Sequence, residues 1–105
     1  MRDYVCTEKV KIELYIINNE QYTDYDIGDC LYNSALQSDV KDDAYEACRE
    51  IAEDLYKTVT GEYKCIVEIN LDYINSYYYF DGWECDVEWD YQLISKEETD
   101  YWKEN

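Results

Sequence analysis

The 105-residue sequence predicts a single α+β domain, residues 1–105, in which an antiparallel-rich sheet of three to four strands carries one main amphipathic helix on one face. Apolar residues recur at every second position in three segments, as in strands with one buried face, and at every third or fourth position in one segment, as in a helix. Hydrophobic residues make up 47% of the chain, which is typical of a folded domain. The predicted order is strand, short helix, main helix, two or three strands, and a short terminal helix.

The first strand is predicted at Cys6–Ile16, because its even positions from Val10 onward are apolar while Lys and Glu stand between them. Asn18 and Asn19 end the strand. The polar stretch from Asn18 to Asp29 is interpreted as a loop that leads into a short helix over Cys30–Gln37.

The main helix is predicted to begin at an N-cap formed by Ser38-Asp39 and to end before Gly61. Apolar side chains recur between these points at spacings of three and four: Ala44, Cys48, Ile51, Ala52, Leu55, Tyr56 and Val59. The charged residues between them are interpreted as an ordinary solvated helix face.

After Gly61 the period of two returns and predicts a long strand over Tyr63–Tyr73 and another over Trp83–Leu93, the latter with one dry face. Between them, Asn75-Ser76 and Asp81-Gly82 each suit a turn or a bulge, and Tyr77–Phe80 suits a short strand. A two-strand hairpin and a three-strand meander both remain open.

The C-terminal segment Ser95–Lys103 is predicted to form a short helix, since Ser95 followed by Glu98 matches a capping box.

The five Cys residues are widely spaced, with no C-x-x-C pair and no His in the chain, which argues against a zinc site and against a catalytic thiol. Four of them lie on the same strand face or the same helix stripe as neighbouring apolar residues and are predicted to act as small core hydrophobes: Cys6, Cys48, Cys65 and Cys85. We expect reduced thiols, because the count is odd and the expected compartment is reducing.

The stretch Asp24-x-Asp26-x-Gly28-Asp29 resembles the start of a calcium loop but departs from it, because Gly28 precedes Asp29 and Ala35 stands where a bidentate Glu belongs. No Gly-rich phosphate loop or hydrolase motif is present. We therefore expect no enzyme activity, with no catalytic, cofactor-binding or metal-binding residues.

The chain is strongly acidic: 9 Lys and Arg against 26 Asp and Glu give a net charge of 9 − 26 = −17. This excludes a basic protein that binds nucleic acid directly through its phosphates. Between Ile66 and Ser95 there is no Lys or Arg and there are seven acids: Glu68, Asp72, Asp81, Glu84, Asp86, Glu88 and Asp90. Between Glu20 and Val40 five acids again have no basic neighbour: Glu20, Asp24, Asp26, Asp29 and Asp39.

Within the last predicted strand, four acids at alternate positions share one face at a spacing of about 6.7 Å: Glu84, Asp86, Glu88 and Asp90. Like charges at that distance repel by roughly 0.6 kcal/mol per neighbouring pair in water, so stability does not explain the row. One strand of DNA carries a phosphate about every 3.4 Å along its axis, so the row has about half that charge density. A basic groove that holds a nucleic-acid backbone would attract such a face.

Fourteen Tyr residues add candidate contact area, because an exposed Tyr has few rotamers to lose and a polar tip. Tyr22 and Tyr25 lie in acidic, turn-like sequence, as do Tyr77, Tyr78 and Tyr79. The predicted partner-binding residues include the seven acids between Ile66 and Ser95. They also include three acids of the earlier stretch, Asp24, Asp26 and Asp29, and three tyrosines, Tyr77, Tyr78 and Tyr79.

In size, acidity, tyrosine content and α/β pattern, the whole chain resembles the small phage-encoded inhibitors that mimic DNA, such as anti-CRISPR proteins, anti-restriction proteins and the uracil-DNA glycosylase inhibitor. The resemblance is compositional and includes no motif. It implies a stoichiometric inhibitor that occupies the nucleic-acid-binding site of a CRISPR effector nuclease or another DNA-processing enzyme.

The partner expected on this interpretation is a basic nucleic-acid-binding protein, such as a nuclease or a nuclease–guide complex. We expect the protein to act in the host bacterial cytoplasm as a monomer or homodimer. No membrane contact is expected, since no apolar run reaches the length of a membrane span and the N-terminus is charged. An acidic protein-binding adaptor or phage accessory protein without nucleic-acid mimicry is the alternative. An inert acidic domain, whose charge serves solubility, is a further one.

Overall fold

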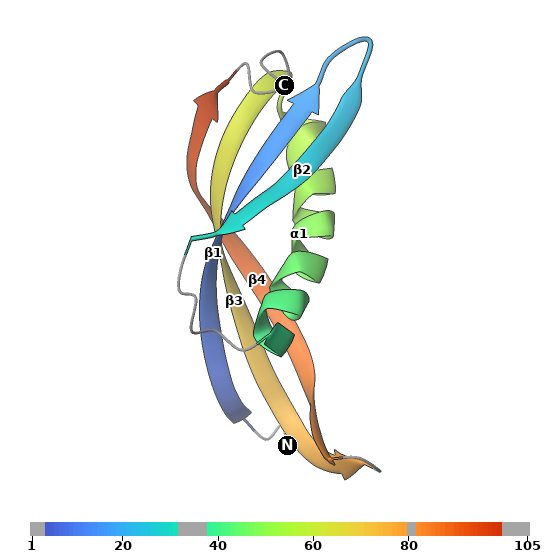
Figure 1. Cartoon of the computed structure of the whole chain (residues 1–105), viewed down its shortest axis with the longest axis vertical. Coiled ribbons are helices and arrows are strands. Elements are labelled where there is room, and N and C mark those ends of the chain that lie inside the picture. The colour runs from blue at the N-terminus through green and yellow to red at the C-terminus, as the bar shows by residue number, and fades with distance from the viewer. Residues whose placement is uncertain (1–3, 32–37, 80–81, 100–105) are drawn as a thin grey trace.

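The computed structural model describes residues 4–31, 38–79 and 82–99, which form four strands and one helix (Figure 1). The elements follow one another as β1 (Tyr4–Asn18), β2 (Thr23–Cys30), α1 (Ser38–Thr58), β3 (Gly61–Tyr79) and β4 (Gly82–Glu98). The strands form one antiparallel sheet in the order β2-β1-β3-β4, and α1 packs on one face of it. The prediction of an α+β fold with a helix on one face of an antiparallel sheet is confirmed.

The core lies between α1 and the two central strands, β1 and β3. Apolar side chains of β1 at alternate positions are fully buried, from Val10 to Ile16, and so are those of β3 from Cys65 to Leu71. These strands pair in register over most of their length, with Ile12 opposite Val67 and Val10 opposite Ile69. Both predicted strands are therefore confirmed, and each is longer than its periodicity indicated.

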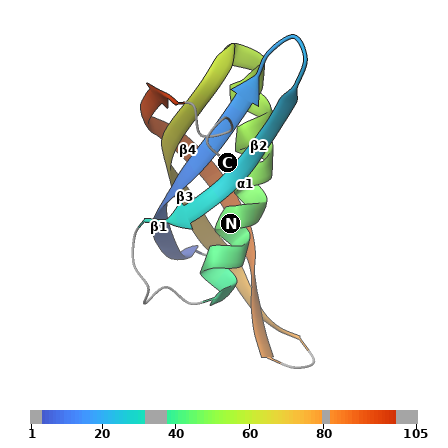
Figure 2. The same ribbon diagram turned by 45° about the horizontal axis from the view of Figure 1, so that its top comes forward.

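The main helix also matches its prediction. α1 begins at Ser38 and ends at Thr58, just before the predicted stop at Gly61, which opens β3 with a φ of 124°. Its buried stripe packs against β1 first and against β2 and β3 at its margins: Val40, Ala44, Ala47, Cys48, Ile51, Ala52 and Leu55. Figures 1 and 2 show the helix lying along β1 and β2, with the lower part of the β3–β4 hairpin extending past its end.

The Asn18 side chain links the β1–β2 hairpin to the C-terminus of α1 through hydrogen bonds. The Asn18 side-chain amide donates to the Val59 carbonyl at 2.9 Å and to the Tyr56 carbonyl, so it satisfies carbonyl groups left open at the helix C-terminus. In the turn itself, the Asn19 carboxamide oxygen accepts from the backbone N–H groups of Gln21 and Tyr22. The prediction that the asparagines end β1 is thus confirmed.

The predicted loop over Asn18–Asp29 is wrong from Thr23 onward, where β2 begins. Tyr25 and Ile27 turn toward the helix and pack against the core, while Asp24 and Asp26 turn away. Asp has a low strand propensity, which hid the alternation, but charged residues are common on edge strands such as β2. The predicted helix over Cys30–Gln37 is wrong at Cys30, which ends β2, and residues 32–37 lie outside the described residues.

The segment after Gly61 is a two-strand hairpin, which decides between the two alternatives. β3 continues to Tyr79, and the register shift between Ile74 and Tyr77 makes Asn75-Ser76 a bulge, with Asn75 at φ 54°. No separate strand over Tyr77–Phe80 exists in the described part of the chain, since Tyr77–Tyr79 belong to β3. Asp81 lies outside the described residues, and β4 begins at Gly82.

Two predictions for β4 need correction. Ser95 and Glu98 lie in the strand, where Ser95 faces Ile66 and Glu98 faces Tyr63, so pairing with β3 overrides the capping-box signal. Residues 100–103 lie outside the described residues. The expected dry face of β4 is only half dry: Trp89 and Tyr91 pack against the core, whereas Val87 is 36% exposed and Leu93 is 40% exposed.

The cysteines divide into two classes. Cys48 and Cys65 are fully buried, as predicted, while Cys6 and Cys85 are half-buried and so are not core residues. Burial raises the pKa of the Cys48 thiol to about 12 and raises the pKa of Cys65 as well. These two thiols therefore stay protonated in the folded chain at pH values where an unfolded thiol ionises.

We predict that iodoacetamide at pH 8 labels Cys85 readily and leaves Cys48 and Cys65 unmodified until the chain is denatured. For Cys48, the thiolate fraction is about 1000-fold below that of an unshifted thiol, because its pKa is raised from 9.0 to about 12. Peptide mass spectrometry over a time course measures each rate, and labelling in guanidinium is the control. Equal labelling rates for Cys48 and Cys85 in the native protein would contradict the buried assignment.

Candidate partner-binding face

The strand pairing determines which acids share a surface. Since the odd-numbered residues of β3 from Cys65 to Leu71 are buried under α1, Glu68 and Asp72 lie on the opposite side, here called the open face. The register places Asp86, Glu88 and Asp90 of β4 on the same open face, opposite Ile74, Asp72 and Asn70 in that order.

We define the acidic face as five carboxylates on the β3–β4 half of the open face: Glu68, Asp72, Asp86, Glu88 and Asp90. Successive acids of β4 are about 6.7 Å apart along the strand. Asp72 and Glu88 are directly paired across the two strands, where side chains are about 5 Å apart at Cβ and like charges destabilise the sheet. The arrangement is thus two-dimensional, because β3 contributes acids beside the β4 row.

Neutral donors hold three of these carboxylates. The Thr7 hydroxyl donates to Asp72 Oδ1 at 2.6 Å, and the Asn70 amide donates to Asp90 Oδ1 at 3.0 Å. On the Asp86 carboxylate, Oδ2 accepts from the Asn75 side chain at 3.2 Å. A hydroxyl or amide donor orients a carboxylate without cancelling its charge, so the surface keeps its negative potential.

The cations of the open face lie toward the middle and far end of the sheet. Lys11 of β1 stands opposite Glu68, and Lys9 stands opposite Asn70. Lys64 lies 4.0 Å from Glu13 and 3.8 Å from Glu97, which is well along the sheet from the acidic face. The open face therefore has mixed charge at its centre and a negative region along β4 and the adjoining part of β3.

The second predicted group of acids is not part of this region. Asp24 and Asp26 lie on the open face of β2, at the opposite edge of the sheet, and Asp29 is exposed near the end of that strand. From the register and the strand spacing, Asp26 and Asp90 are about 25 Å apart. The two predicted acidic stretches therefore lie at opposite edges of the sheet.

Four of the remaining predicted residues lie near the β3–β4 connection. Tyr77, Tyr78 and Tyr79 belong to β3 and Glu84 to β4, but their side chains lie outside what the structure describes, as does Asp81 entirely. Of the other tyrosines proposed as contacts, Tyr22 is 48% exposed in the β1–β2 turn. Tyr25 packs against the core and is not a free contact residue.

Charges on β4 also serve the sheet itself, since β4 is an edge strand and acidic side chains discourage pairing with another chain. Edge protection accounts for acids on β4. It does not account for Asp72, which lies on an interior strand directly opposite Glu88. Protection of the edge strand therefore does not explain why acids of β3 lie beside those of β4.

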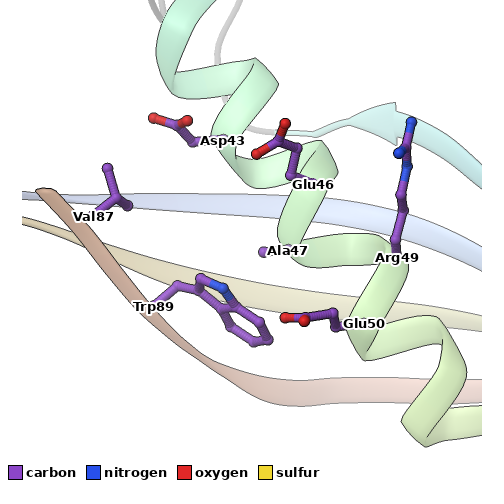
Figure 3. A pocket seen from close by; sticks show the side chains of 7 residues that line it. All are labelled: Asp43, Glu46, Ala47, Arg49, Glu50, Val87 and Trp89. Atoms are coloured by element: carbon purple, nitrogen blue, oxygen red, sulfur yellow. The ribbon is translucent and has the colours of Figure 1, made fainter.

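A groove on the other side of β4 was not anticipated from the sequence. It lies between α1 and β4, has a volume of about 400 Å³, and is bordered on the helix by Asp43, Glu46 and Glu50 (Figure 3). Val87 and Trp89 form its β4 side. The spacings of three and four between Asp43, Glu46 and Glu50 could have indicated the helical side of this groove. The other side depends on where β4 lies in the sheet.

One wall of the groove is tied to the sheet by a hydrogen bond. The Tyr73 hydroxyl donates to Asp43 Oδ2 at 2.9 Å. Burial and the Asp43 carboxylate together raise the pKa of Tyr73, so the hydroxyl keeps its proton and continues to donate.

Within residues 4–31, 38–79 and 82–99, no three Cys, Asp or Glu side chains come together in a way that could hold a metal ion. The Asp24–Asp29 stretch that resembled a calcium loop lies in β2. In the same described part of the chain, no helix has the length and apolar character needed to cross a membrane.

No family model, curated protein or solved structure matches this chain.

We predict that D86N/D90N raises the free energy of unfolding by about 0.5 kcal/mol at low salt, because it removes like-charge repulsion while keeping the oxygens that accept from Asn75 and Asn70. Urea denaturation at 20 mM and 1 M NaCl measures the gain, which should vanish at high salt. E97Q, which removes a carboxylate near Lys64, is the control and should give no gain. A loss of stability in D86N/D90N would mean that these carboxylates stabilise the fold.

Proposed function

We propose that the protein is a stoichiometric inhibitor whose acidic face occupies the nucleic-acid-binding site of a CRISPR effector nuclease or another DNA-processing enzyme. The observation that supports this most is the direct pairing of Asp72 with Glu88 beside the row formed with Asp86 and Asp90, with three of these carboxylates accepting from neutral donors. Like charges directly opposite each other destabilise a sheet, so the presence of this pair favours a role in binding.

The charge geometry suits a cleft built for a polyanion. Charges repeat about every 6.7 Å along β4, and a second line of acids lies one strand away, about 4.8 Å to the side. The resulting density is of the order of that of a phosphate backbone. A rigid sheet orders these charges before binding, which lowers the entropy lost on association.

The competing proposal is an acidic adaptor that binds a protein surface unrelated to nucleic acid. The groove between α1 and β4 favours this candidate, because Val87 and Trp89 offer apolar contact there. The two proposals differ in salt dependence. A carboxylate face in a basic cleft loses affinity steeply with salt, whereas an adaptor contact made by Val87 and Trp89 alone does not.

We predict that the protein, mixed in equimolar amount with an RNA-guided nuclease before DNA is added, blocks DNA binding and cleavage, and that adding DNA first prevents inhibition. Gel shift and cleavage assays over a panel of such nucleases measure this. The dissociation constant of the complex should rise at least 100-fold between 0.05 and 0.5 M NaCl. An affinity independent of salt would favour the adaptor.

The decisive variant is D86N/E88Q/D90N, called the acidic-face variant, which should weaken inhibition by at least 10-fold, mainly through a slower association rate.

Its matched control is D42N/E53Q/D54N, which removes three exposed helical acids and has the same net charge, −17 + 3 = −14. The control should inhibit within 3-fold of the unmodified chain. Equal losses in the two variants would mean that overall charge, and not the acidic face, governs binding.

A further inference from the structure

The groove between α1 and β4 exists because α1 is narrower than the sheet it covers. α1 lies over β1, and β4 is two strands away, or about 10 Å. A helix with its side chains is about 10–12 Å wide, so it reaches only about 5–6 Å to either side of its axis. Among the described residues, the helix-facing side of β4 is consequently covered only in part.

From Val87 to Leu93, the helix-facing side of β4 is apolar. Val87 is 36% exposed and Leu93 is 40% exposed, although both point to the helix side of the sheet. Trp89 and Tyr91 stand between them, half-buried against the margin of the core, with ring centroids 6.5 Å apart. Aromatic side chains that are half-covered in a concave surface are the usual anchors of protein interfaces.

The rim facing this strip is acidic. Figure 3 shows Asp43, Glu46 and Glu50 along the groove side of α1, with Ala47 between them and the Trp89 ring opposite. Arg49, also at the groove, points away from β4 in the same view. An apolar floor beside a row of carboxylates is complementary to an element that is apolar on one side and basic on the other.

We propose that this groove binds a basic amphipathic α-helix of a partner protein, laid beside α1 across β3 and β4. A helix packs about 8–10 Å from a neighbouring helix, and β4 lies about 10 Å from the strand beneath α1, so a second helix beside α1 would lie over β4. A second copy of this chain is disfavoured as the occupant, because each copy carries a charge of −17. The site lies on the opposite side of β4 from the acidic face, so the two surfaces are separate and the proposal does not depend on the inhibitor function.

The test uses a synthetic 18-residue peptide with Leu at helical spacings of three and four and Lys elsewhere, titrated into the full chain at 0.15 M NaCl and followed by NMR. We expect binding in the micromolar range, amide shifts at Ala47, Val87 and Trp89, and increased peptide helicity by circular dichroism. A scrambled peptide of the same composition should bind at least 10-fold more weakly. Equal binding of the scrambled peptide, shifts centred on Glu88 and Asp90, or a peptide bound as a strand would overturn the proposal.

Charge reversal on the helix locates the site without disturbing the core. E46K/E50K changes two exposed residues and should weaken the peptide at least 10-fold. D42K/E53K changes two exposed residues outside the groove and gives the same net charge, −17 + 4 = −13. This control should weaken peptide binding less than 3-fold. Equal effects of the two pairs would mean diffuse attraction and would overturn the proposal.

Two further variants separate the surfaces. W89A removes the Trp89 side chain from the groove and should weaken peptide binding at least 10-fold. Thermal unfolding checks that the domain still folds. The acidic-face variant should bind the peptide within 3-fold of the unmodified chain. Loss of peptide binding in that variant would place the peptide on the open face and overturn this proposal, while loss of nuclease inhibition alone concerns the proposed function.

Discussion

The packing of α1 on the two central strands is the constraint on which the rest of this structure depends. Alternate residues of β1 and β3 are fully buried against one stripe of α1, from Val10 to Ile16 and from Cys65 to Leu71. That contact determines which side of every strand faces the core. Because side chains alternate along the regular part of each strand, it also determines that Glu68, Asp72, Asp86, Glu88 and Asp90 share the opposite side.

The same contact explains why β4 has two surfaces of different character. On the open face, the strand presents carboxylates beside those of β3. On the helix side, it presents Val87, Trp89 and Leu93 to a space that α1 is too narrow to fill. An edge strand with a charged side and a half-apolar side is suited to contact with a partner, and the two proposals assign one surface to each kind of contact.

Periodicity predicted much of this fold, and its failures have physical causes. The positions of β1, α1, β3 and β4 followed from repeats of two or of three and four. β2 was missed because Asp24 and Asp26 alternate with Tyr25 and Ile27, which makes an acidic edge strand look like a polar loop. The strand pairing of Ser95 with Ile66 overrode a local helix signal, because tertiary pairing outweighs one capping motif.

The candidate surfaces were predictable to different degrees. That Asp86, Glu88 and Asp90 share a face follows from alternation alone. Their pairing with β3, and the distance from Asp24 and Asp26, depend on the strand order, which no local pattern contains. The groove depends on where α1 lies across the sheet and so could not be derived from any single segment.

The central claim is that the carboxylates of the acidic face are the contact surface in the inhibited complex. Carboxyl footprinting with carbodiimide and an amine label, applied to the free protein and to its complex with the nuclease it inhibits, tests this most directly. The account predicts that labelling of Asp86, Glu88 and Asp90 falls several-fold in the complex while Asp42 and Glu53 label as before. Unchanged labelling of the acidic face in the complex would contradict it.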